Sequence, residues 1–472
     1  METGLSGPGT MHGGRFFAPL AYLPGGWARD VAFTVDDRGF FASVTAGASA
    51  EGTTRIGGVM LPGMINAHSH AFQRAMVGLT HRAGAGNHGA DNFWSWRALM
   101  YGLALRLTPA QIEAIATWVY TEMLRGGYTH VCEFHYLHND PAGKPYADPA
   151  ELSRAVLRAA ANTGIGITLL PVLYMTNGFG GTPPRDEQRR FLSTPERLLA
   201  MTRQLADEHR GDPRIAFGFA PHSLRAVPPA ALDEAVRGLR RILPDAPIHI
   251  HIAEQTDEVD ACVAWSGQRS VEWLLDHHPV DARWNLVHAT HMNESESRRA
   301  AESRAIVVLC PTTEADLGDG VFDYQAYAAA NGRFSIGTDS QVSRDWLSEL
   351  RMLEYSQRLA LRQRNVAAGL GQSTGEAMFD AALIGGAASS GLPLGRIETG
   401  ARADWLVVRD NKLAFAGRSH EHFLDSLIFD HHPADFADVV VAGVSRRDAL
   451  EGDTYRDARN AFVRTLDEVA PR

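Results

Sequence analysis

The sequence has few cysteines and no long apolar run. Its 472 residues include only three cysteines, Cys132, Cys262 and Cys310, which are too few and too scattered for a disulfide framework. No apolar run approaches the roughly 18 residues that a membrane-spanning helix needs. The N-terminal residues have neither a charged start nor an apolar core, so no signal peptide is expected. We therefore expect a soluble protein of the cytoplasm.

An excess of basic charge is also missing. The chain has 45 Lys and Arg residues against 55 Asp and Glu residues, which gives a formal net charge of -10. No basic cluster suits a phosphate backbone, so we expect neither nucleic acid nor an anionic membrane as the main partner. The unusual count is that of histidine, with 20 residues. A small-molecule partner is the remaining expectation.

The middle of the chain alternates short apolar runs with longer stretches of helical period. The runs lie at residues 59–67, 128–133, 165–174, 215–220, 248–253, 284–289, 305–310 and 333–337. Helical stretches such as TPAQIEAIATWVYTEMLRGG begin with a Thr cap and Pro and end at glycine. This alternation predicts a parallel sheet, and eight units favour a closed TIM (β/α)8 barrel. An open, doubly wound sheet is the alternative, although no Gly-rich phosphate loop follows the first run.

The two ends of the chain have a different pattern. The first 57 residues read as short strands and turns, and GRIETGARADWLVVRD and DVVVAGVSRRD read as similar short strands near the C-terminus. We expect both ends to pair into one small β-sandwich domain beside the barrel. The predicted domains are therefore residues 58–391 for the barrel, with 1–57 and 392–472 together forming the flanking domain.

Histidines and a carboxylate stand at the ends of four predicted strands. His68 and His70 end the first strand, His251 lies in the fifth, His288 ends the sixth and Asp339 follows the eighth. Residues i and i+2 of a strand point to the same side, and barrel enzymes place their active sites at the carboxyl ends of the strands. Such nitrogen and oxygen ligands suit a catalytic zinc ion, which lowers the pKa of its water to about 7.

Two further side chains favour a hydrolytic reaction at this ion. Glu254 leaves the fifth strand three residues after His251, where a carboxylate can carry a proton from water to a leaving nitrogen. The alternative is a surface glutamate at a helix start. His288 can orient the attacking water, or it can serve only in packing. No lysine ends the third or fourth strand to bridge two ions, so a single metal ion is expected, with iron and manganese as alternatives to zinc.

Two other histidine-containing segments carry weaker expectations. The glycine-rich loop at residues 81–89 follows the first ligands and is either a lid over the substrate or an ordinary surface loop. His420, His422, His431 and His432 lie in the tail, far along the chain from the barrel strands. We expect a structural role for these four residues.

The motifs PGMINAHSH, HIHIAEQ, VHATH, GTDS and GRIETGARADWLVV resemble the amidohydrolase superfamily, in its single-zinc deaminase branch. The resemblance covers nearly the whole chain. It implies a distorted TIM (β/α)8 barrel with a flanking β-sandwich, one Zn²⁺ per subunit and a homodimer. It also implies a set of metal ligands and a set of catalytic residues. The implied ligands are His68, His70, His251 and Asp339, and the implied catalytic residues are Glu254, His288 and Asp339.

The segments AHSHAFQRAMVGLTHR, FWSWRALMY, EFHYLH and CPTTEADLGDGVF are similar to members that hydrolyse N-formimino-L-glutamate in histidine degradation. That reaction yields N-formyl-L-glutamate and ammonia. The similarity implies that this dicarboxylate substrate contacts Gln73, Arg97, Tyr136, His222 and Arg225. Arginine binds carboxylates through two parallel hydrogen bonds, which agrees with two arginines near the barrel mouth.

Two other functions remain open at this point. The first is a single-zinc deaminase of the same superfamily that acts on a purine, pterin or guanidine. Purine-deaminating relatives carry Asn at the position of Glu314 in this sequence, which disfavours that substrate class. The second is a non-catalytic assembly protein on an inherited barrel. Such proteins lose metal ligands, whereas this chain keeps them all.

Overall fold

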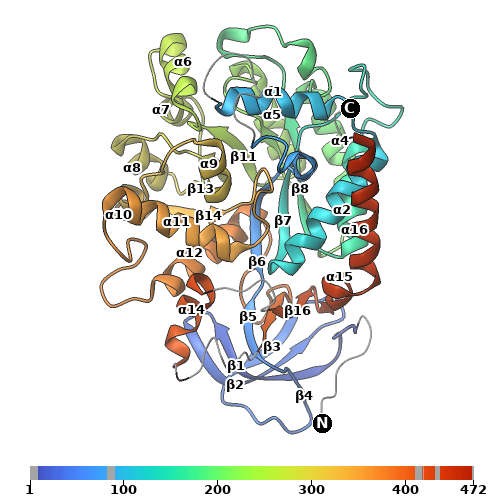
Figure 1. The fold of residues 1–472 in the computed structure, drawn as a ribbon, viewed down its shortest axis with the longest axis vertical. Coiled ribbons are helices and arrows are strands. Elements are labelled where there is room, and N and C mark those ends of the chain that lie inside the picture. The colour runs from blue at the N-terminus through green and yellow to red at the C-terminus, as the bar shows by residue number, and fades with distance from the viewer. Residues whose placement is uncertain (1–8, 82–90, 410–416, 418, 431–435, 470–472) are drawn as a thin grey trace.

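A barrel of alternating strands and helices stands against a curved sheet built from the two ends of the chain (Figure 1). The computed structural model describes residues 9–81, 91–409, 417, 419–430 and 436–469. Within these ranges, no helix is long and apolar enough to cross a membrane.

The barrel consists, in the described residues, of eight parallel strand positions. They are β6 (Met64–Ser69), β7 (Tyr128–His135), β8 (Gly166–Leu173), β9 (Ile215–Phe217) with β10 (Ala220–Pro221), β11 (Ile248–Ile252), β12 (Trp284–His288), β13 (Ile306–Leu309) and β14 (Arg333–Ile336). Hydrogen bonding groups them into one sheet from β6 to β10 and another from β11 to β14. Isolated parallel bridges join Ser69 to Asp339 and Ser223 to His251 across the two seams. The barrel is therefore closed, which confirms the predicted fold class and excludes the open sheet.

The first predicted barrel strand, residues 59–67, is divided between two sheets. Val59–Pro62 forms β5 of the flanking sheet, and only Met64–Ser69 belongs to the barrel. The break falls at Gly63, where a Cβ atom would lie 2.3 Å from Oγ1 of Thr129. Close packing against β7 thus demands glycine at the point where the chain passes from one sheet to the other.

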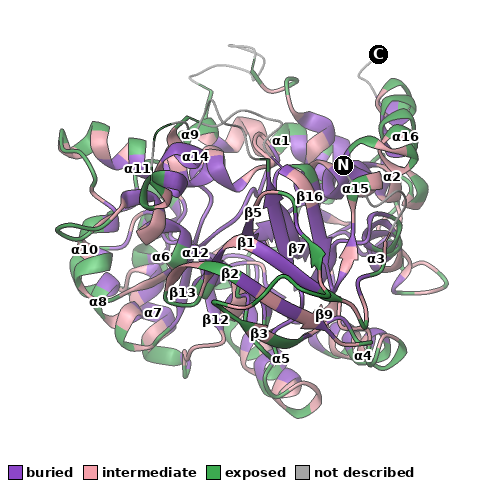
Figure 2. Cartoon of the chain, turned by 90° about the horizontal axis from the view of Figure 1, so that it is seen from below, coloured by how far each residue is buried: buried purple, intermediate pink, exposed green. Residues whose placement is uncertain are grey.

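Helices surround the barrel and turn their buried faces toward the strands (Figure 2). They are α2 (Pro109–Arg125), α3 (Glu151–Thr163), α4 (Pro195–Glu208), α5 (Pro229–Ile242), α6 (Thr256–Ser266), α7 (Ser270–His277), α8 (Glu294–Glu302), α9 (Pro311–Leu317), α10 (Tyr324–Ala329), α11 (Trp346–Leu361) and α12 (Thr374–Ser390). The predicted start of α2 is confirmed, because Oγ1 of Thr108 accepts a hydrogen bond from the backbone N–H of Gln111. A further helix, α1 (Phe93–Ala104), crosses the end of the barrel opposite the flanking sheet (Figure 1).

Short 3-10 segments complete the described barrel loops and tail. They are η1 (Ala71–Met76), η2 (Phe179–Gly181), η3 (Asp186–Gln188) and η4 (His420–His422). The first of these carries the chain out of β6 directly after His70. Residues 82–90, on which the lid hypothesis depends, lie outside the described residues, as do His431 and His432.

The two chain ends share one sheet, as predicted. Its strands are β1 (Arg15–Leu23), β2 (Gly26–Val35), β3 (Phe41–Thr45), β4 (Thr54–Arg55), β5, β15 (Trp405–Val408), β16 (Phe436–Val441) and β17 (Val444–Ser445). Strand β5 joins the ends, because it pairs with β1 on one side and with β15 on the other. The sheet curls around its own core, in which the ring of Trp405 lies 5.3 Å from that of Phe33 and 5.8 Å from that of Phe41.

The C-terminal part of the chain is not built from strands alone. It also contains α14 (Phe423–Phe429), α15 (Arg447–Glu451) and α16 (Asp453–Val469), which the sequence pattern did not predict. Helix α16 runs along α2 (Figure 1), and the ring of Phe462 stacks on that of Trp118 with centroids 5.8 Å apart. The C-terminus thereby covers the barrel wall. The division of the chain at residues 57 and 391 stays a prediction.

Candidate metal and active site

Three imidazole rings from opposite walls of the barrel meet at one point. The Nε2 atoms of His68 and His70 are 3.1 Å apart, and that of His251 lies 3.0 Å from the first and 3.4 Å from the second. His68 and His70 stand at the end of β6, and His251 stands on β11. All three side chains are buried. The barrel thus brings together the three histidines that the sequence singled out.

Hydrogen bonds from Nδ1 of two of these rings determine which ring nitrogen is available to bind a metal. Nδ1 of His70 donates to the carbonyl oxygen of Phe134 at 2.9 Å, and Nδ1 of His251 donates to that of His222 at 3.2 Å. A carbonyl only accepts, so each Nδ1 carries the proton and each Nε2 presents a lone pair. Burial lowers the pKa of His70 to about 3, and burial followed by the neighbouring histidines lowers that of His251. Both rings therefore remain neutral.

Asp339 adds a carboxylate to the same point. It follows β14, and its Oδ1 lies 3.4 Å from Nε2 of His70 and 3.7 Å from Nε2 of His68. Burial raises the pKa of this carboxyl to about 7, against the opposing charge of His288. A buried carboxyl of this kind is stabilised as an anion by a cation beside it.

The arrangement of these donors fits a metal ion. The three histidines form a group whose ligand atoms could hold one. Nitrogens separated by 3.0 to 3.4 Å leave a point about 2 Å from each of them, which is the usual Zn–N distance. Three neutral nitrogens and one carboxylate match a catalytic zinc site, which keeps a further position for water. The residues present therefore fit the expected ion.

His288 lies between three carboxylates beside this point. Its Nε2 is 3.6 Å from Oε1 of Glu254 and 3.6 Å from Oδ2 of Asp339, and its Nδ1 is 3.3 Å from Oε1 of Glu314. Burial lowers the pKa of His288, but the charges of Glu254, Glu314 and Asp339 outweigh burial and raise it to about 10. His288 is therefore a cation that can donate a proton toward the reaction point.

The backbone at the ends of these strands is unusual. His288 has a φ of 67° and Asp339 one of 44°, and Ala253, just before Glu254, has one of 50°. Side chains other than glycine rarely occupy this left-handed region, which costs about 1 kcal/mol or more per residue. The strain is held by hydrogen bonds, such as those from the N–H of Asp339 to the carbonyl of His68 and from the N–H of His291 to that of Ala253. It lies at His288, at Asp339 and directly before Glu254.

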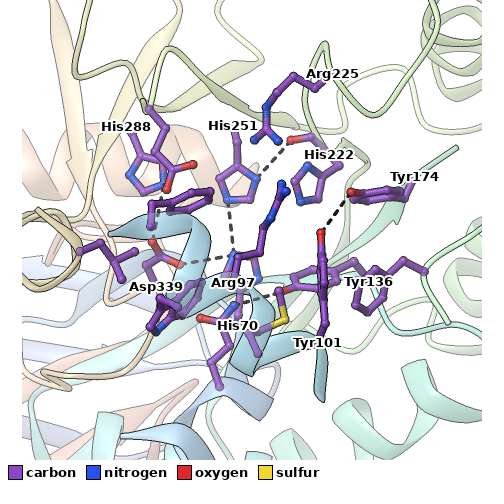
Figure 3. A pocket seen from close by; sticks show the side chains of 17 residues that line it. His70, Arg97, Tyr101, Tyr136, Tyr174, His222, Arg225, His251, His288 and Asp339 are labelled. Carbon is purple, nitrogen blue, oxygen red and sulfur yellow. Dashed lines mark hydrogen bonds and ion pairs between the residues drawn. The ribbon is translucent and has the colours of Figure 1, made fainter. Parts of the chain in front are cut away.

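A pocket opens from the metal ligands toward α1 and the loops of the barrel mouth. It is lined by all five residues predicted to contact substrate, together with His70, His251, Glu254, His288 and Asp339 (Figure 3). The five are Gln73, Arg97, Tyr136, His222 and Arg225. His68 completes the metal cluster at the floor, where it is fully buried. The structure thus gathers every predicted site residue, whereas their roles stay predictions.

Two arginines lie in this pocket on the side away from His288 (Figure 3). The guanidinium carbons of Arg97 and Arg225 lie 4.4 and 5.8 Å from the ring of Trp94. Burial, followed by the charge of Arg225, lowers the pKa of Arg97. Nε of Arg225 lies 3.9 Å from Oε2 of Glu258 and has no hydrogen-bond partner among the described residues. Burial lowers the pKa of Arg225, but its neighbours, first Glu258 and also Glu254, outweigh burial and raise it. The half-buried guanidinium of Arg97 and the buried one of Arg225 together present positive charge that an anionic ligand would neutralise.

Several pocket residues were missed by the sequence reading. The hydroxyl oxygens of Tyr101 and Tyr174 are 3.5 Å apart, and Nε2 of Gln188 donates a hydrogen bond to each of them. Tyr101 lies on α1 and Gln188 on η3, where no strand periodicity marks a functional position, whereas Tyr174 ends the predicted strand at residues 165–174. The aromatic-rich segment FWSWRALMY includes Tyr101 alone of the three.

A fourth carboxyl near His288 was also missed. Asp319 follows α9 and is 4% exposed, and a carboxylate oxygen of it lies within 4.8 Å of ligand atoms of Glu254 and His288. Burial and the charge of Glu254 raise its pKa. The histidines of the tail lie elsewhere: in the described part of the tail, His420 and His422 form η4, and the ring of His420 packs against that of Trp27.

The chain belongs to the amidohydrolase family, whose sequence profile matches residues 59–445. It is a hydrolase that acts on carbon–nitrogen bonds. A relative from Pseudomonas aeruginosa, named formimidoylglutamate deiminase, is 47% identical over 457 residues, which are 96% of this chain and 99% of the relative.

Solved structures support the same family. An amidohydrolase from Brucella melitensis is 44% identical, with a TM-score of 0.89 over 97% of this chain and 100% of that chain. An adenosine deaminase from Xanthomonas campestris, solved with bound zinc, is 24% identical, with a TM-score of 0.77 over 96% of this chain and 98% of that chain. At that identity the second structure shows the fold alone.

Proposed function

We propose that this protein is a zinc-dependent deiminase that hydrolyses N-formimino-L-glutamate to N-formyl-L-glutamate and ammonia in histidine degradation. The observation that carries the proposal is the polarity of the pocket. The carboxyls of Glu254 and Asp339 and the guanidinium groups of Arg97 and Arg225 all line it, and Arg225 lies on the other side of His251 from Asp339 and His288 (Figure 3). Formiminoglutamate has a matching shape, with a cationic amidine at one end and two carboxylates at the other. The identity to the Pseudomonas enzyme supports the same substrate.

In this proposal His68, His70, His251 and Asp339 hold one Zn²⁺ per subunit. When bound, zinc supplies hydroxide at neutral pH, because it lowers the pKa of water to about 7. The zinc named with the Xanthomonas structure supports this choice of metal. The homodimer and the cytoplasmic location expected from the sequence stay predictions.

Glu254 moves the proton in the proposed reaction. It accepts the proton that water gives up when its oxygen bonds to the formimino carbon, and it passes this proton to the terminal nitrogen. The bond between that nitrogen and the carbon then breaks and ammonia leaves with the bonding electrons. The remaining hydroxyl proton passes to the Glu254 carboxylate as the formyl C=O forms. His288, as a cation 3.6 Å from both Glu254 and Asp339, stabilises the negative charge that develops on the attacking oxygen.

Arg97 and Arg225 determine which nitrogen leaves. Cleavage of the other carbon–nitrogen bond would yield glutamate and formamide. If both substrate carboxylates are held at the arginine end, the terminal nitrogen is the one that faces Glu254. Tyr136, Gln73 and His222 complete the wall between the two ends, with Nε2 of Gln73 donating to the hydroxyl of Tyr136 at 2.8 Å.

Steady-state kinetics over a substrate panel tests this proposal. We expect ammonia release from formiminoglutamate to exceed that from guanine, 8-oxoguanine, adenosine and a formimino compound without carboxylates by at least about 100-fold in kcat/KM. Two lost carboxylate contacts account for a difference of this order. Preference for a neutral heterocycle would contradict the proposal and favour another deaminase of the family.

A further inference from the structure

A second group of possible metal ligands lies beside the histidine cluster. It consists of one nitrogen of His288 and one carboxylate oxygen each from Glu254 and Asp319, all within 4.8 Å of one another. The three residues are 1%, 5% and 4% exposed. Glu254 and His288 belong to the proposed reaction, whereas Asp319 has no role in it. The group shares no residue with the three histidines of the first cluster.

Asp319 is held firmly, with one oxygen left without a partner. Its backbone N–H donates to the carbonyl of Glu314 at 2.9 Å, and its own carbonyl accepts from Nε2 of His291 at 2.8 Å. Nε2 of Gln255 donates to Oδ1. The remaining oxygen, Oδ2, is buried and has no hydrogen-bond partner among the described residues. An unpartnered carboxylate oxygen in a dry site is costly, and a cation beside it removes that cost.

We propose that Glu254, His288 and Asp319 form a second cation site, which takes up zinc in excess of the first ion and stops turnover. One imidazole nitrogen and two carboxylate oxygens are ligands that zinc accepts at about 2.0 to 2.2 Å. Zinc binds the His288 nitrogen by displacing its proton, so uptake of this ion releases one proton to solvent. Oε1 of Glu254 and Nε2 of His288, at 3.6 Å, are already separated as two ligands of one ion would be. Glu254 and His288 line the pocket, so an ion reaches them from the substrate side.

The second ion inhibits turnover because it binds two side chains that the proposed reaction needs. A Glu254 carboxylate bound to zinc cannot accept the proton from water, and a ligated His288 cannot act as a cation. This consequence rests on the proposed function, because it requires Glu254 and His288 to act in the reaction. The binding of the ion itself does not.

Equilibrium dialysis against Zn²⁺, with metal counted by mass spectrometry, tests the binding. We expect the wild-type chain to hold two ions at saturation and one after brief dialysis against zinc-free buffer. Asp319→Asn should hold one ion under both conditions. Asp316→Asn is the matched control, since Asp316 lies on α9 with its carboxylate 2.6 Å from Nε2 of His81, and it should hold two. One ion in the saturated wild type, or two in Asp319→Asn, would overturn the proposal.

Two further measurements support the ion count: a second ligand variant and an inhibition assay. His288→Asn removes a different ligand of the same site and should also hold one ion, which decides the matter if Asp319→Asn does not fold. In the activity assay, Asp319→Asn should need at least about tenfold more Zn²⁺ for half-inhibition than the wild type. A wild type that binds two ions with unchanged turnover would overturn the inhibitory role. A protein inactive on formiminoglutamate would refute the proposed function while leaving the ion count decisive.

Discussion

Oε1 of Glu254 lies 3.6 Å from Nε2 of His288, although the two residues come from the ends of different strands, β11 and β12. Both side chains are buried beside the three converging histidines. A carboxylate and an imidazolium held at this distance can act together at one reacting centre. The carboxylate takes up a proton, and the imidazolium stabilises negative charge. In the pocket His288 lies on one side of His251 and Arg225 on the other (Figure 3).

Replacing Glu254 with Gln should remove turnover while keeping the metal. The amide is of the same size but cannot accept a proton, so we expect kcat to fall by about 10²- to 10⁴-fold. The variant should keep one tightly bound ion per chain after dialysis against zinc-free buffer, as the wild type does, because Glu254 is not among the ligands of the first ion. Parallel measurements of kcat and metal per chain check this. Near-wild-type turnover in the variant would remove Glu254 from its role.

Replacing Arg97 with Lys should weaken the handling of the substrate carboxylates. Lysine keeps the charge but loses the planar fork, so we expect kcat/KM for formiminoglutamate to fall by about 10- to 100-fold. Arg106→Lys, at an exposed position just after α1, is the control and should leave kcat/KM unchanged. Equal kinetics for both variants would place the substrate carboxylates elsewhere.

Removing the metal should abolish activity reversibly. After treatment with a chelator we expect turnover to vanish and to return on addition of one equivalent of Zn²⁺. Ion binding to the folded chain should also raise the thermal midpoint, since a ligand at 100 times its Kd stabilises by about 2.7 kcal/mol. His70→Asn should bind zinc at least about tenfold more weakly, with His209→Asn, at a half-buried position that does not line the pocket, as control. Full turnover in metal-free protein would refute a metal-dependent reaction.

Buried neutral histidines away from the metal should make the fold sensitive to acid. Burial lowers the pKa of His138 to about 4, and burial and then His138 lower that of His135 to about 3. Below about pH 6.5 these histidines bind protons in the unfolded chain but not in the folded one. The free energy of unfolding therefore falls as the pH falls toward 4. Each such group contributes about 1.4 kcal/mol per pH unit in that range.

The His138→Gln variant checks this with urea unfolding between pH 6.5 and 4.5. We expect its unfolding free energy to fall less steeply with pH than that of the wild type, by about 1.4 kcal/mol per unit. His277→Gln, at an exposed position, is the control and should keep the wild-type slope. Identical slopes for His138→Gln and the wild type would contradict the prediction.

The sequence predicted those site residues that lie on strands or directly after them. His68, His70 and Asp339 were found because strand periodicity and the carboxyl-end rule constrain them together. Tyr174 was missed although it ends the predicted strand at residues 165–174, because only histidines and carboxylates were considered at strand ends. Asp319 was missed because it lies in a loop, where position depends on long-range packing that no local pattern records. The division of the first predicted strand at Gly63 was missed for a similar reason, since its cause is contact with Thr129 some 65 residues away. Helix α16 packs on α2 through Phe462, a contact likewise set by tertiary structure.

The products formed from formiminoglutamate labelled with ¹⁵N at its terminal nitrogen test the central claim most directly. The account predicts that all of the label appears in ammonia and that the other product is formylglutamate, because Glu254 protonates the nitrogen that faces the metal end of the pocket. Label recovered in formamide, with glutamate as the other product, would contradict it.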